Sequence, residues 1–409
     1  MNIYKRENYL KKIRGFYNDD ETIKVIVGIR RCGKSYLLKS IISELKEMGI
    51  NDSDIINIEL DKRPNKNIKT PDELEKLIDS KITDNNFKYL FIDEIQNVKG
   101  FEELIDAYRS EGNISIFLTG SNSYLLSGEL ATKLTGRKIE IEMLPLTFYE
   151  YLDMKKFYNK EINSNYYLEF QDYIRQGGFP GSMKFDNIED KMRYTQNVIK
   201  DIFKKDIKPN EKIKNPDLFN SIQNYIINNY GSVVSVNSIK KYYNSKKINI
   251  DERTIQRYID ILENAKIIYK CGLFDIKSKN TLDGSSKYYL ADTSIYFAMN
   301  TDNRINYGPF LENVLYNYLI SKDYKISVGR IGKLECDFIV RYGLENYYYI
   351  QVSKNIDDEK TMTREYRPFY EIRDMYPRYL FILDIILQKN VDGINNVNIV
   401  DFIANNKDL

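Results

Sequence analysis

Apolar runs alternate with segments of helical periodicity along the first 145 residues. Four apolar runs lie at 23–28, 55–60, 88–92 and 114–118, and the first is nearly continuous, as a strand buried on both faces requires. A fifth segment, 138–143, alternates apolar and polar residues. Between several of these runs, apolar residues recur every three or four positions and predict amphipathic helices. The pattern predicts an α/β fold with a parallel sheet.

The first expected strand ends in a glycine-rich loop. Residues 28–35 read Gly-Ile-Arg-Arg-Cys-Gly-Lys-Ser, which has the Gly-x-x-x-x-Gly-Lys-Ser spacing of a phosphate-binding loop. The glycines let backbone N–H groups converge on phosphate oxygens. Lys34 is then expected to reach the β- and γ-phosphates, and Ser35 to bind Mg²⁺. A chance match is the alternative, and the strand before the loop and the helix after it argue against one. The expected nucleotide-binding residues here are Gly28, Arg30, Arg31, Cys32, Gly33, Lys34, Ser35 and Tyr36.

The helix that follows the loop is amphipathic. Its apolar residues between Leu37 and Met48 form one stripe, and Gly49 is expected to end it. The N-terminus of this helix points at the bound phosphates, and its dipole favours their negative charge. The sequence therefore predicts a nucleotide-binding chain.

Two acids follow the third apolar run. Asp93 is expected to support Mg²⁺ through water, and Glu94 to polarise the attacking water. The alternative is that both are plain turn residues.

The fourth run ends in the polar cluster Thr119 to Ser123, where open α/β sheets bind ligands. Thr119 and Ser121, and less strongly Asn122, are expected to sense the γ-phosphate, while Ser123 fits a helix cap equally well.

Arg137 comes just before the fifth run. It is expected at the mouth of the sheet, where an arginine neutralises transition-state charge in its own subunit or across an interface. The alternative is a solvated residue that starts an edge strand.

Several motifs together carry a family resemblance. They are Gly28 to Ser35 with the Arg30-Arg31 pair, Asp93 to Gln96, Thr119 to Ser123, Leu134 to Arg137 and Pro145 to Phe148. This set resembles the prokaryotic AAA-superfamily ATP-binding proteins whose C-terminal half is a domain of unknown function. Arg175 to Pro180 resembles the lid segment of that family. The resemblance covers essentially the whole chain. It implies an ATPase core, a helical lid and two appended modules, but no biological role.

Composition narrows the chemistry. The 409 residues contain no histidine, which excludes Ser-His-Asp and Cys-His sites and His-ligated zinc. The three cysteines have no metal or disulfide spacing, and a reducing cytoplasm fits best. The net charge of +2 gives no overall bias toward polyanions. No apolar run approaches the about 18 residues of a membrane span, and the N-terminus lacks a signal-peptide core.

Residues 145–290 are expected to be mainly helical. The stretch 145–208 suits a lid, with Arg175 as a candidate second sensor, and 204–210 is the best linker candidate. Three helices and a hairpin within 215–290 have the winged helix arrangement. Its basic residues are a candidate DNA patch, although neighbouring acids dilute the charge and winged helices often mediate protein contacts. These basic residues are Lys240, Lys241, Lys246, Lys247, Arg253 and Arg257, and the polar Gln256 shares the exposed face of Arg253 and Arg257.

The C-terminal residues 308–409 resemble a restriction-endonuclease-like domain. Asp337 fits the first acid of a Mg²⁺ site of that type, and Glu312 fits a helix-borne acid. The expected Glu-x-Lys triplet instead reads Gln351-Val352-Ser353, and Lys354 falls on the opposite strand face from Gln351. Too little charge remains to hold a divalent ion, so a binding or scaffold module is expected. Thr361, Arg364 and Glu365 also match the family pattern, without assigned chemistry.

The predicted architecture is α/β: a P-loop NTPase core with a parallel sheet and helical lid, then a winged-helix module and a restriction-endonuclease-like domain. The expected domains are 1–145, 146–208, 209–290 and 291–409. The expected function is Mg²⁺-dependent ATP hydrolysis that controls the appended modules. The alternatives are an ATP-gated DNA-binding protein and a metal-dependent nuclease that uses Asp337. ATP and Mg²⁺ are the expected cofactors, with DNA, a protein or a second copy of the chain as possible partners.

Overall fold

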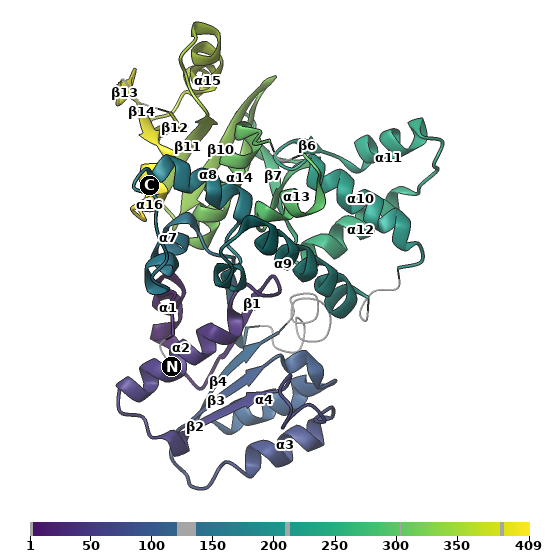
Figure 1. Cartoon of the computed structure of the whole chain (residues 1–409), viewed down its shortest axis with the longest axis vertical. Helices are drawn as coiled ribbons and strands as arrows, with labels where there is room; N and C mark the ends of the chain where they lie inside the picture. The colour runs from purple at the N-terminus through teal and green to yellow at the C-terminus, as the bar shows by residue number, and fades with distance from the viewer. Residues whose placement is uncertain (1–2, 121–135, 209–212, 303, 385–387) are drawn as a thin grey trace. The chain divides into compact units, whose positions relative to one another are not determined.

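The computed structural model describes residues 3–120, 136–208, 213–302, 304–384 and 388–409 (Figure 1). The chain forms two compact units. The first contains Met1–Leu144 and Asp201–Glu211, and the second contains Pro145–Lys200 and Lys212–Leu409. The backbone therefore passes between the units at three places, after residues 144, 200 and 211.

The first unit contains a parallel five-stranded sheet in the order β2-β3-β4-β1-β5. The strands are β1 Ile23–Gly28, β2 Ile55–Glu59, β3 Lys88–Asp93, β4 Ile114–Thr119 and β5 Lys138–Met143. Every residue of β1, β3 and β4 is buried, because these central strands are covered on both faces. The five expected strands and the parallel α/β sheet are confirmed.

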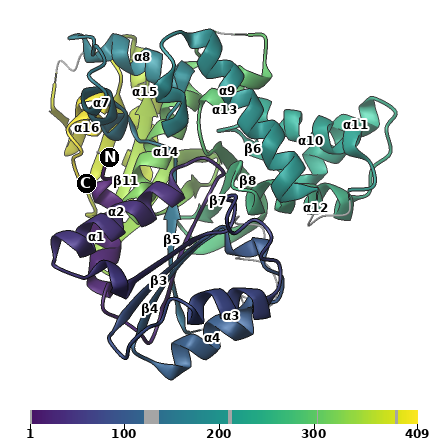
Figure 2. The same ribbon diagram turned by 60° about the horizontal axis from the view of Figure 1, so that its bottom comes forward.

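Helices cover this sheet, and α3 and α4 lie together on one face (Figure 2). Apolar residues of α3 and α4 share a core with β1, β2, β3 and β4. A capping box between Thr70 and Glu73 begins α3, and Gly49, with φ +90°, follows the end of α2 as expected. The helical elements of this unit are α1 Glu7–Ile13, η1 Arg14–Phe16, α2 Lys34–Glu47, η2 Asp52–Asp54, α3 Pro71–Asp79, η3 Ile95–Asn97, α4 Phe101–Glu111 and the π-helix η5 Ile202–Ile207.

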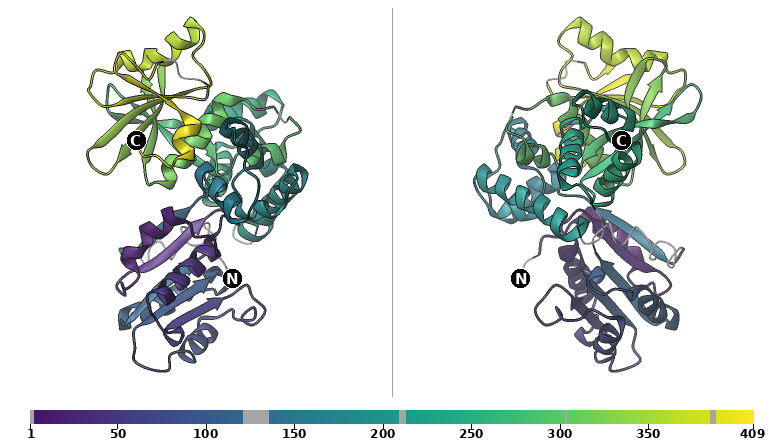
Figure 3. Two further views of the ribbon diagram at one scale, coloured as in Figure 1. Left: turned by 60° about the vertical axis from the view of Figure 1, so that its left-hand side comes forward. Right: turned by 90° about the vertical axis from the view of Figure 1, so that its right-hand side faces the viewer.

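Nine strands of the described residues form one sheet in the second unit, which Figure 3 shows from two sides. The order is β13-β14-β12-β11-β10-β9-β7-β8-β6. The strands are β6 Val233–Val234, β7 Ile268–Asp275, β8 Asn280–Leu290, β9 Lys325–Ile331, β10 Leu334–Tyr342, β11 Asn346–Ser353, β12 Arg378–Ile382, β13 Asn390–Val391 and β14 Ile394–Asn398. The helices are α7 Phe148–Phe157, α8 Tyr166–Gln176, η4 Pro180–Lys184, α9 Ile188–Asp201, α10 Pro216–Asn228, α11 Val236–Ser245, α12 Glu252–Asn264, α13 Ser294–Met299, α14 Tyr307–Ser321, α15 Glu359–Glu371 and α16 Ile399–Ala404.

The three helices and the hairpin expected within 215–290 are present as α10, α11, α12 and β7–β8. Ile255, Tyr258, Ile259 and Leu262 are buried on α12, as the periodicity predicts. However, β7 also pairs in parallel with β9, so one sheet runs through two of the expected modules. The strand β9 is not predicted from its own sequence. The division into four domains and the winged helix assignment stay predictions.

The Gly177-Gly178 pair of the expected lid is a packing requirement within the second unit. A Cβ on Gly177 would lie 1.9 Å from Oδ1 of Asp292, and one on Gly178 would lie 2.1 Å from the Leu146 carbonyl oxygen. The buried Asp292 carboxylate accepts a hydrogen bond from the Gly178 N–H at 2.6 Å. Burial raises the pKa of Asp292 to about 6, against the hydrogen bonds from Ser294 and Gly178. Residues 145–208 are largely helical as expected, but lid closure over a nucleotide stays a prediction.

Residues 201–211 differ from the sequence expectation of a lid end followed by a linker. They belong to the first unit, and Asp206 and Ile207 of η5 are buried.

Among the described residues, no helix is long and apolar enough to cross a membrane.

Candidate functional site

The glycine-rich loop joins β1 to α2 at the carboxyl edge of the first sheet. Gly28 ends β1 with φ +144°, and a Cβ at this position would lie 2.1 Å from the Met143 carbonyl oxygen. Gly33 has φ +114° and precedes the first residue of α2, Lys34. Both conformations favour glycine, since a Cβ would be strained there. The fold therefore explains the two glycines of the motif.

Lys34 lies beneath this loop. Its buried ammonium Nζ donates to the carbonyl oxygens of Gly28 at 2.9 Å and Ile29 at 3.3 Å. These contacts hold the lysine at the start of α2, beside the backbone that the motif predicts to surround phosphate. Tyr36 follows in the first turn, where it is exposed and has the Lys39 ammonium 5.6 Å from its ring centroid.

Asp93, Ser35 and Thr119 meet although they come from three different elements. The Ser35 Oγ donates to Oδ1 of Asp93 at 3.0 Å. The fully buried Thr119 hydroxyl donates to the same Asp93 oxygen and accepts the Glu94 N–H at 3.1 Å. Because β1, β3 and β4 are parallel neighbours, their carboxyl ends share one edge of the sheet. The structure thus brings these three candidate residues together, and their roles stay predictions.

The environment of Asp93 affects its protonation. Burial raises the pKa of Asp93, against the opposing hydrogen bond from Thr119, and the nearby Glu94 charge raises it further. A cation bound next to Asp93 would favour the charged carboxylate, since a nearby positive charge lowers the pKa of an acid.

Glu94 has a strained backbone. Its φ of +59° and ψ of +48° lie in the left-handed region, which costs a non-glycine residue roughly 1–2 kcal/mol. The Gln96 side-chain amide donates to Oε2 of Glu94 and thereby fixes the carboxylate. Strain of this kind concentrates at functional positions. Gln96 belongs to the Asp93 to Gln96 motif, but the motif alone gives it no role.

Arg30, Arg31 and Cys32 have different environments within the loop. Arg30 binds the Asp206 carboxylate with both ends of its guanidinium, Nε to Oδ2 at 2.8 Å and Nη2 to Oδ1 at 2.5 Å. Arg31 is exposed with φ +69°, and Cys32 is fully buried. Burial raises the pKa of the Cys32 thiol, which keeps it protonated.

Asp206 and Arg6 contact the loop and are not predicted from the sequence. Arg6 is buried and donates from Nη1 to the Cys32 carbonyl at 3.0 Å and the Leu144 carbonyl at 2.7 Å. Each lies in a segment with no recognisable motif. A charged residue among other charged or polar residues gives no sequence signal of its burial, so only the tertiary structure reveals these contacts.

The predicted position of Arg137 is wrong. Because β5 runs parallel to β1, Arg137 precedes β5 at the amino edge of the sheet, and its carbonyl accepts the Ile23 N–H at the start of β1. The phosphate loop follows the other end of β1, roughly 17 Å away at 3.3 Å per residue. Nη1 of Arg137 contacts Oδ2 of Asp106 at 2.8 Å. In this structure Arg137 therefore lies away from the phosphate loop of its own chain, and a catalytic role for it stays a prediction.

Ser121 and Asn122, the other expected γ-phosphate sensors, lie outside the described residues. Arg175 lies in α8 of the second unit, and its role as a second sensor stays a prediction.

The residues around Ser35 fit Mg²⁺. Oγ of Ser35 and the Asp93 carboxylate are hard oxygen donors, which Mg²⁺ prefers, and this ion usually keeps waters and phosphate oxygens among its ligands. In the part of the chain that the structure describes, no three acidic or cysteine side chains form a metal cage. The protein would therefore hold Mg²⁺ together with a nucleotide.

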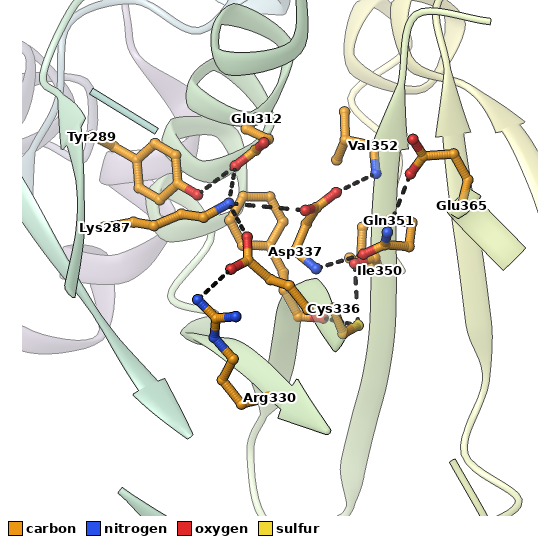
Figure 4. Close-up of polar contacts among 12 residues, drawn as sticks. Lys287, Tyr289, Glu312, Arg330, Cys336, Asp337, Ile350, Gln351, Val352 and Glu365 are labelled. Carbon is orange, nitrogen blue, oxygen red and sulfur yellow. Dashed lines mark hydrogen bonds and ion pairs between the residues drawn. The ribbon is translucent and has the colours of Figure 1, made fainter. Parts of the chain in front are cut away.

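A second cluster of charges surrounds Lys287 in the second unit (Figure 4). The Lys287 ammonium, which comes from β8, lies 2.8 Å from Oε2 of Glu312, 2.8 Å from Oε1 of Glu335 and 3.9 Å from Oδ1 of Asp337. Burial lowers the pKa of Lys287, but the three carboxylates outweigh this and raise it. Burial also raises the pKa values of Glu312 and Asp337. The positive charge among these carboxylates is therefore supplied by the protein itself, through the Lys287 ammonium.

Asp337 contacts the altered triplet through two hydrogen bonds. Oε1 of Gln351 accepts the Asp337 N–H at 2.6 Å, and the Val352 N–H donates to Oδ2 of Asp337 at 2.9 Å. The Gln351 amide in turn donates to Oε2 of Glu365 at 3.2 Å, which gives Glu365 a structural role (Figure 4). Lys354 lies over the Tyr307 ring instead, 5.0 Å from its centroid. Lys287 is missed from sequence because it resembles an ordinary strand residue.

Several side chains of the candidate DNA patch have partners within the chain, and one of these contacts is an ion pair. Lys240 contacts Glu252 at 2.9 Å, Lys246 donates to the Tyr242 hydroxyl at 2.6 Å, and Gln256 donates to Asp260 at 2.7 Å. DNA binding by this module stays a prediction.

Comparisons with known proteins agree with this geometry. The AAA domain family matches residues 20–152, and a domain of unknown function (DUF8612) matches residues 167–305. The chain is 32% identical over 400 residues to an uncharacterized protein of Haemophilus influenzae, covering 97% of this chain and 98% of that protein. It is 30% identical over 368 residues to an uncharacterized protein of Methanocaldococcus jannaschii, covering 86% of this chain and 79% of that protein.

Among solved structures, the fold is similar to the Walker-type ATPase PABY2304 of Pyrococcus abyssi. The TM-score is 0.51 at 18% identity, and the match covers 73% of this chain and 96% of that one. At this identity the likeness concerns the fold alone. It fits the parallel sheet described above.

Proposed function

This chain belongs to the same family as these Haemophilus influenzae and Methanocaldococcus jannaschii proteins, and its residues 20–152 match the AAA domain; from that premise we propose that it is a Mg²⁺-dependent ATPase. The observation that carries the proposal is the network at the carboxyl edge of the first sheet. Ser35 and Thr119 both bind Asp93 there, and Thr119 also binds the backbone of Glu94. Parallel α/β sheets bind ligands at this edge.

Each residue of the network has a proposed task. The loop N–H groups and the Lys34 ammonium bind the β- and γ-phosphates of ATP. Ser35 and, through water, Asp93 hold Mg²⁺, which neutralises phosphate charge when bound. Glu94 orients and polarises the attacking water. Thr119 fixes Asp93 and Glu94 relative to one another, a task that differs from direct sensing of the γ-phosphate.

The test compares two variants of the full chain. Glu94→Gln keeps the size of the side chain and removes its charge, so ATP binding is expected to persist while turnover falls by roughly 100-fold or more. Lys34→Ala is expected to weaken ATP binding itself. Binding is measured by titration with a fluorescent ATP analogue, and turnover by phosphate release. Full hydrolysis by Glu94→Gln would contradict the role of Glu94.

We further propose that the nucleotide state of the first unit controls the second unit, whose role is to bind or support a partner. The Lys287 ammonium among three carboxylates supports a scaffold over a nuclease, because the protein itself supplies the cation. ATP-gated DNA binding through α10 to α12 is the alternative. A gel shift of duplex DNA that depends on ATP would favour DNA binding, and the absence of a shift would favour the scaffold.

A further inference from the structure

The phosphate loop is tied to one place where the chain returns to the first unit. Arg30 and Asp206 are 176 residues apart in sequence, yet they form a two-point ion pair with distances of 2.5 and 2.8 Å. Their side chains are only 18% and 7% exposed. A fork of this kind fixes the direction of the guanidinium as well as its position. Arg30 is thus held as a rigid part of the loop.

The segment that supplies Asp206 is unusual. The chain leaves α9, enters the first unit at residue 201 and leaves it again after residue 211. Within this short return, residues 202–207 form a π-helix that follows α9 without a break. Single π-helical turns are rare and occur often at functional sites. Asp206 thus belongs to an unusual backbone element that continues directly from α9.

A second tie lies at another crossing. Arg6 joins the Cys32 carbonyl of the loop to the carbonyl of Leu144, the residue after which the chain first leaves the first unit. The loop between Gly28 and Gly33 is thus held from two sides, at Arg30 and at Cys32. The first tie ends on Asp206, within the returning segment, and the second ends on Leu144, the last residue before the chain first leaves the unit.

The electrostatic surroundings agree with a catalytic context. Burial alone would lower the pKa of Arg30, but its hydrogen bonds and charge attraction with Asp206 outweigh burial, and Glu94 also contributes to the net rise. Arg30 therefore lies within the electrostatic influence of the proposed water-polarising residue. Without Asp206, the guanidinium would be free to turn toward Glu94 or toward phosphate.

We propose that Asp206 is a positioning residue for ATP hydrolysis: it fixes Arg30, and through it the loop backbone, and links the loop to the returning segment 201–207. This inference rests on the function proposed above. The occupant of the loop is a nucleoside triphosphate, and Asp206 acts on it through Arg30 without touching it.

A double-mutant cycle on the full chain tests the proposal. Asp206→Asn, Arg30→Gln and the double variant are compared with wild type for kcat, KM and the Kd of a fluorescent ATP analogue. Each single variant is expected to lose roughly 10- to 100-fold in kcat, since a misplacement of about 1 Å costs this much, while KM changes less than about threefold. The double variant is expected to lose no more than either single variant, because both remove the same contact.

Two controls separate positioning from folding. Asp190→Asn removes a carboxylate from α9, outside the segment 201–207, where Asp190 contacts Arg193 at 3.1 Å, and is expected to keep kcat within about twofold. Asp206→Glu keeps the charge and is expected to recover most of the lost kcat. Thermal unfolding of each variant checks that the measured protein is folded, and Arg30→Gln tests the same contact if Asp206→Asn does not fold.

Three outcomes would overturn the inference or its premise. Wild-type kcat in folded Asp206→Asn would refute positioning, as would losses that multiply in the double variant. The absence of ATP hydrolysis by the wild type would instead contradict the proposed ATPase function. The wild-type rate, measured first, distinguishes these failures.

Discussion

The hydroxyl of Thr119 donates a hydrogen bond to the carboxylate of Asp93, across the pairing of β4 with β3. The hydroxyl oxygen of Thr119 also accepts a hydrogen bond from the N–H of Glu94 at 3.1 Å. One buried hydroxyl thus fixes both acids that the sequence proposes for hydrolysis. Its two partners leave it directed at the protein, which separates its task from that of a ligand-facing sensor.

Replacing Thr119 by Val is expected to lower kcat by roughly 10- to 100-fold. Val has a similar shape but leaves the buried Asp93 oxygen and the Glu94 N–H with one partner fewer, at a cost of about 1–3 kcal/mol. Thr119→Ser keeps the hydroxyl and is expected to retain most activity. Phosphate release at saturating ATP measures both variants. Equal rates for Val and wild type would contradict a positioning role for this hydroxyl.

Lys24 gives a prediction for the pH dependence of stability. Its ammonium is buried in β1, where it donates to the Asp19 and Thr22 carbonyls and lies 4.9 Å from the ring centroid of Phe117. Burial lowers the pKa of Lys24 to about 8, against the attraction of Asp19 and Asp20. Above pH 8 the folded chain releases this proton while the unfolded chain, with its pKa near 10.5, keeps it. The contribution of Lys24 to stability therefore rises with pH.

The comparison is wild type against Lys24→Met between pH 7.5 and 9.5. Wild type is expected to gain stability relative to the variant as pH rises, because Met has no proton to release. The urea midpoint of each protein, followed by circular dichroism at each pH, measures the difference. Tyrosines and cysteines titrate in both proteins and cancel in the comparison. A difference that stays constant across this range would contradict the lowered pKa.

The sequence predicts the sheet and the site for a physical reason. Strands buried on both faces need continuous apolar residues, and the motifs follow these strands directly, so Ser35, Asp93 and Thr119 are placed together by parallel pairing alone. The expectation for Arg137 conflicts with the predicted parallel sheet, because a residue that precedes a strand of such a sheet lies at the amino edge. The parallel pairing of β5 with β1 places Arg137 there.

Contacts between distant segments escape sequence reasoning for another reason. Asp206 and Lys287 lie in stretches without a motif, and each becomes meaningful only through a partner far away in the chain. A buried charge requires an opposite charge or hydrogen bonds, but a sequence does not tell which charges are buried. The hairpin β7–β8 is predicted correctly, whereas its pairing with β9 depends on the tertiary fold.

DNA binding through α10 to α12 predicts a steep salt dependence. If the exposed Lys241, Lys247, Arg253 and Arg257 contact phosphates, the Kd for duplex DNA is expected to rise by roughly 10-fold or more between 50 and 200 mM salt. Fluorescence titration with labelled duplex measures it, with and without ATP. Arg253→Ala is expected to weaken binding and reduce the salt slope. Binding that is absent at low salt would exclude this alternative.

Lys287→Met is expected to destabilise the second unit strongly. Met has a similar length but no charge, so Glu312, Glu335 and Asp337 would lose the cation that lies between them. Removal of one partner from a buried ion pair costs about 3–5 kcal/mol. The matched control is Lys270→Met, since Lys270 lies opposite Tyr288 on the neighbouring strand β7 and is exposed. Urea unfolding followed by circular dichroism is expected to show a large loss only for Lys287→Met.

The pH dependence of this loss tests the cause. In Lys287→Met the raised pKa values of Glu312 and Asp337 are expected to rise further, because the nearby positive charge is gone. Protonation relieves the repulsion among the acids, so the deficit relative to wild type should shrink as pH falls from 8 to 5. A deficit that is equal at both pH values would show that packing, and not charge, carries the effect.

The same cluster predicts that the wild-type protein does not cleave DNA. Wild type should leave plasmid DNA intact in Mn²⁺, since Lys287 supplies the cation of the cluster. Cleavage that disappears in Asp337→Ala would instead establish a metal-dependent nuclease.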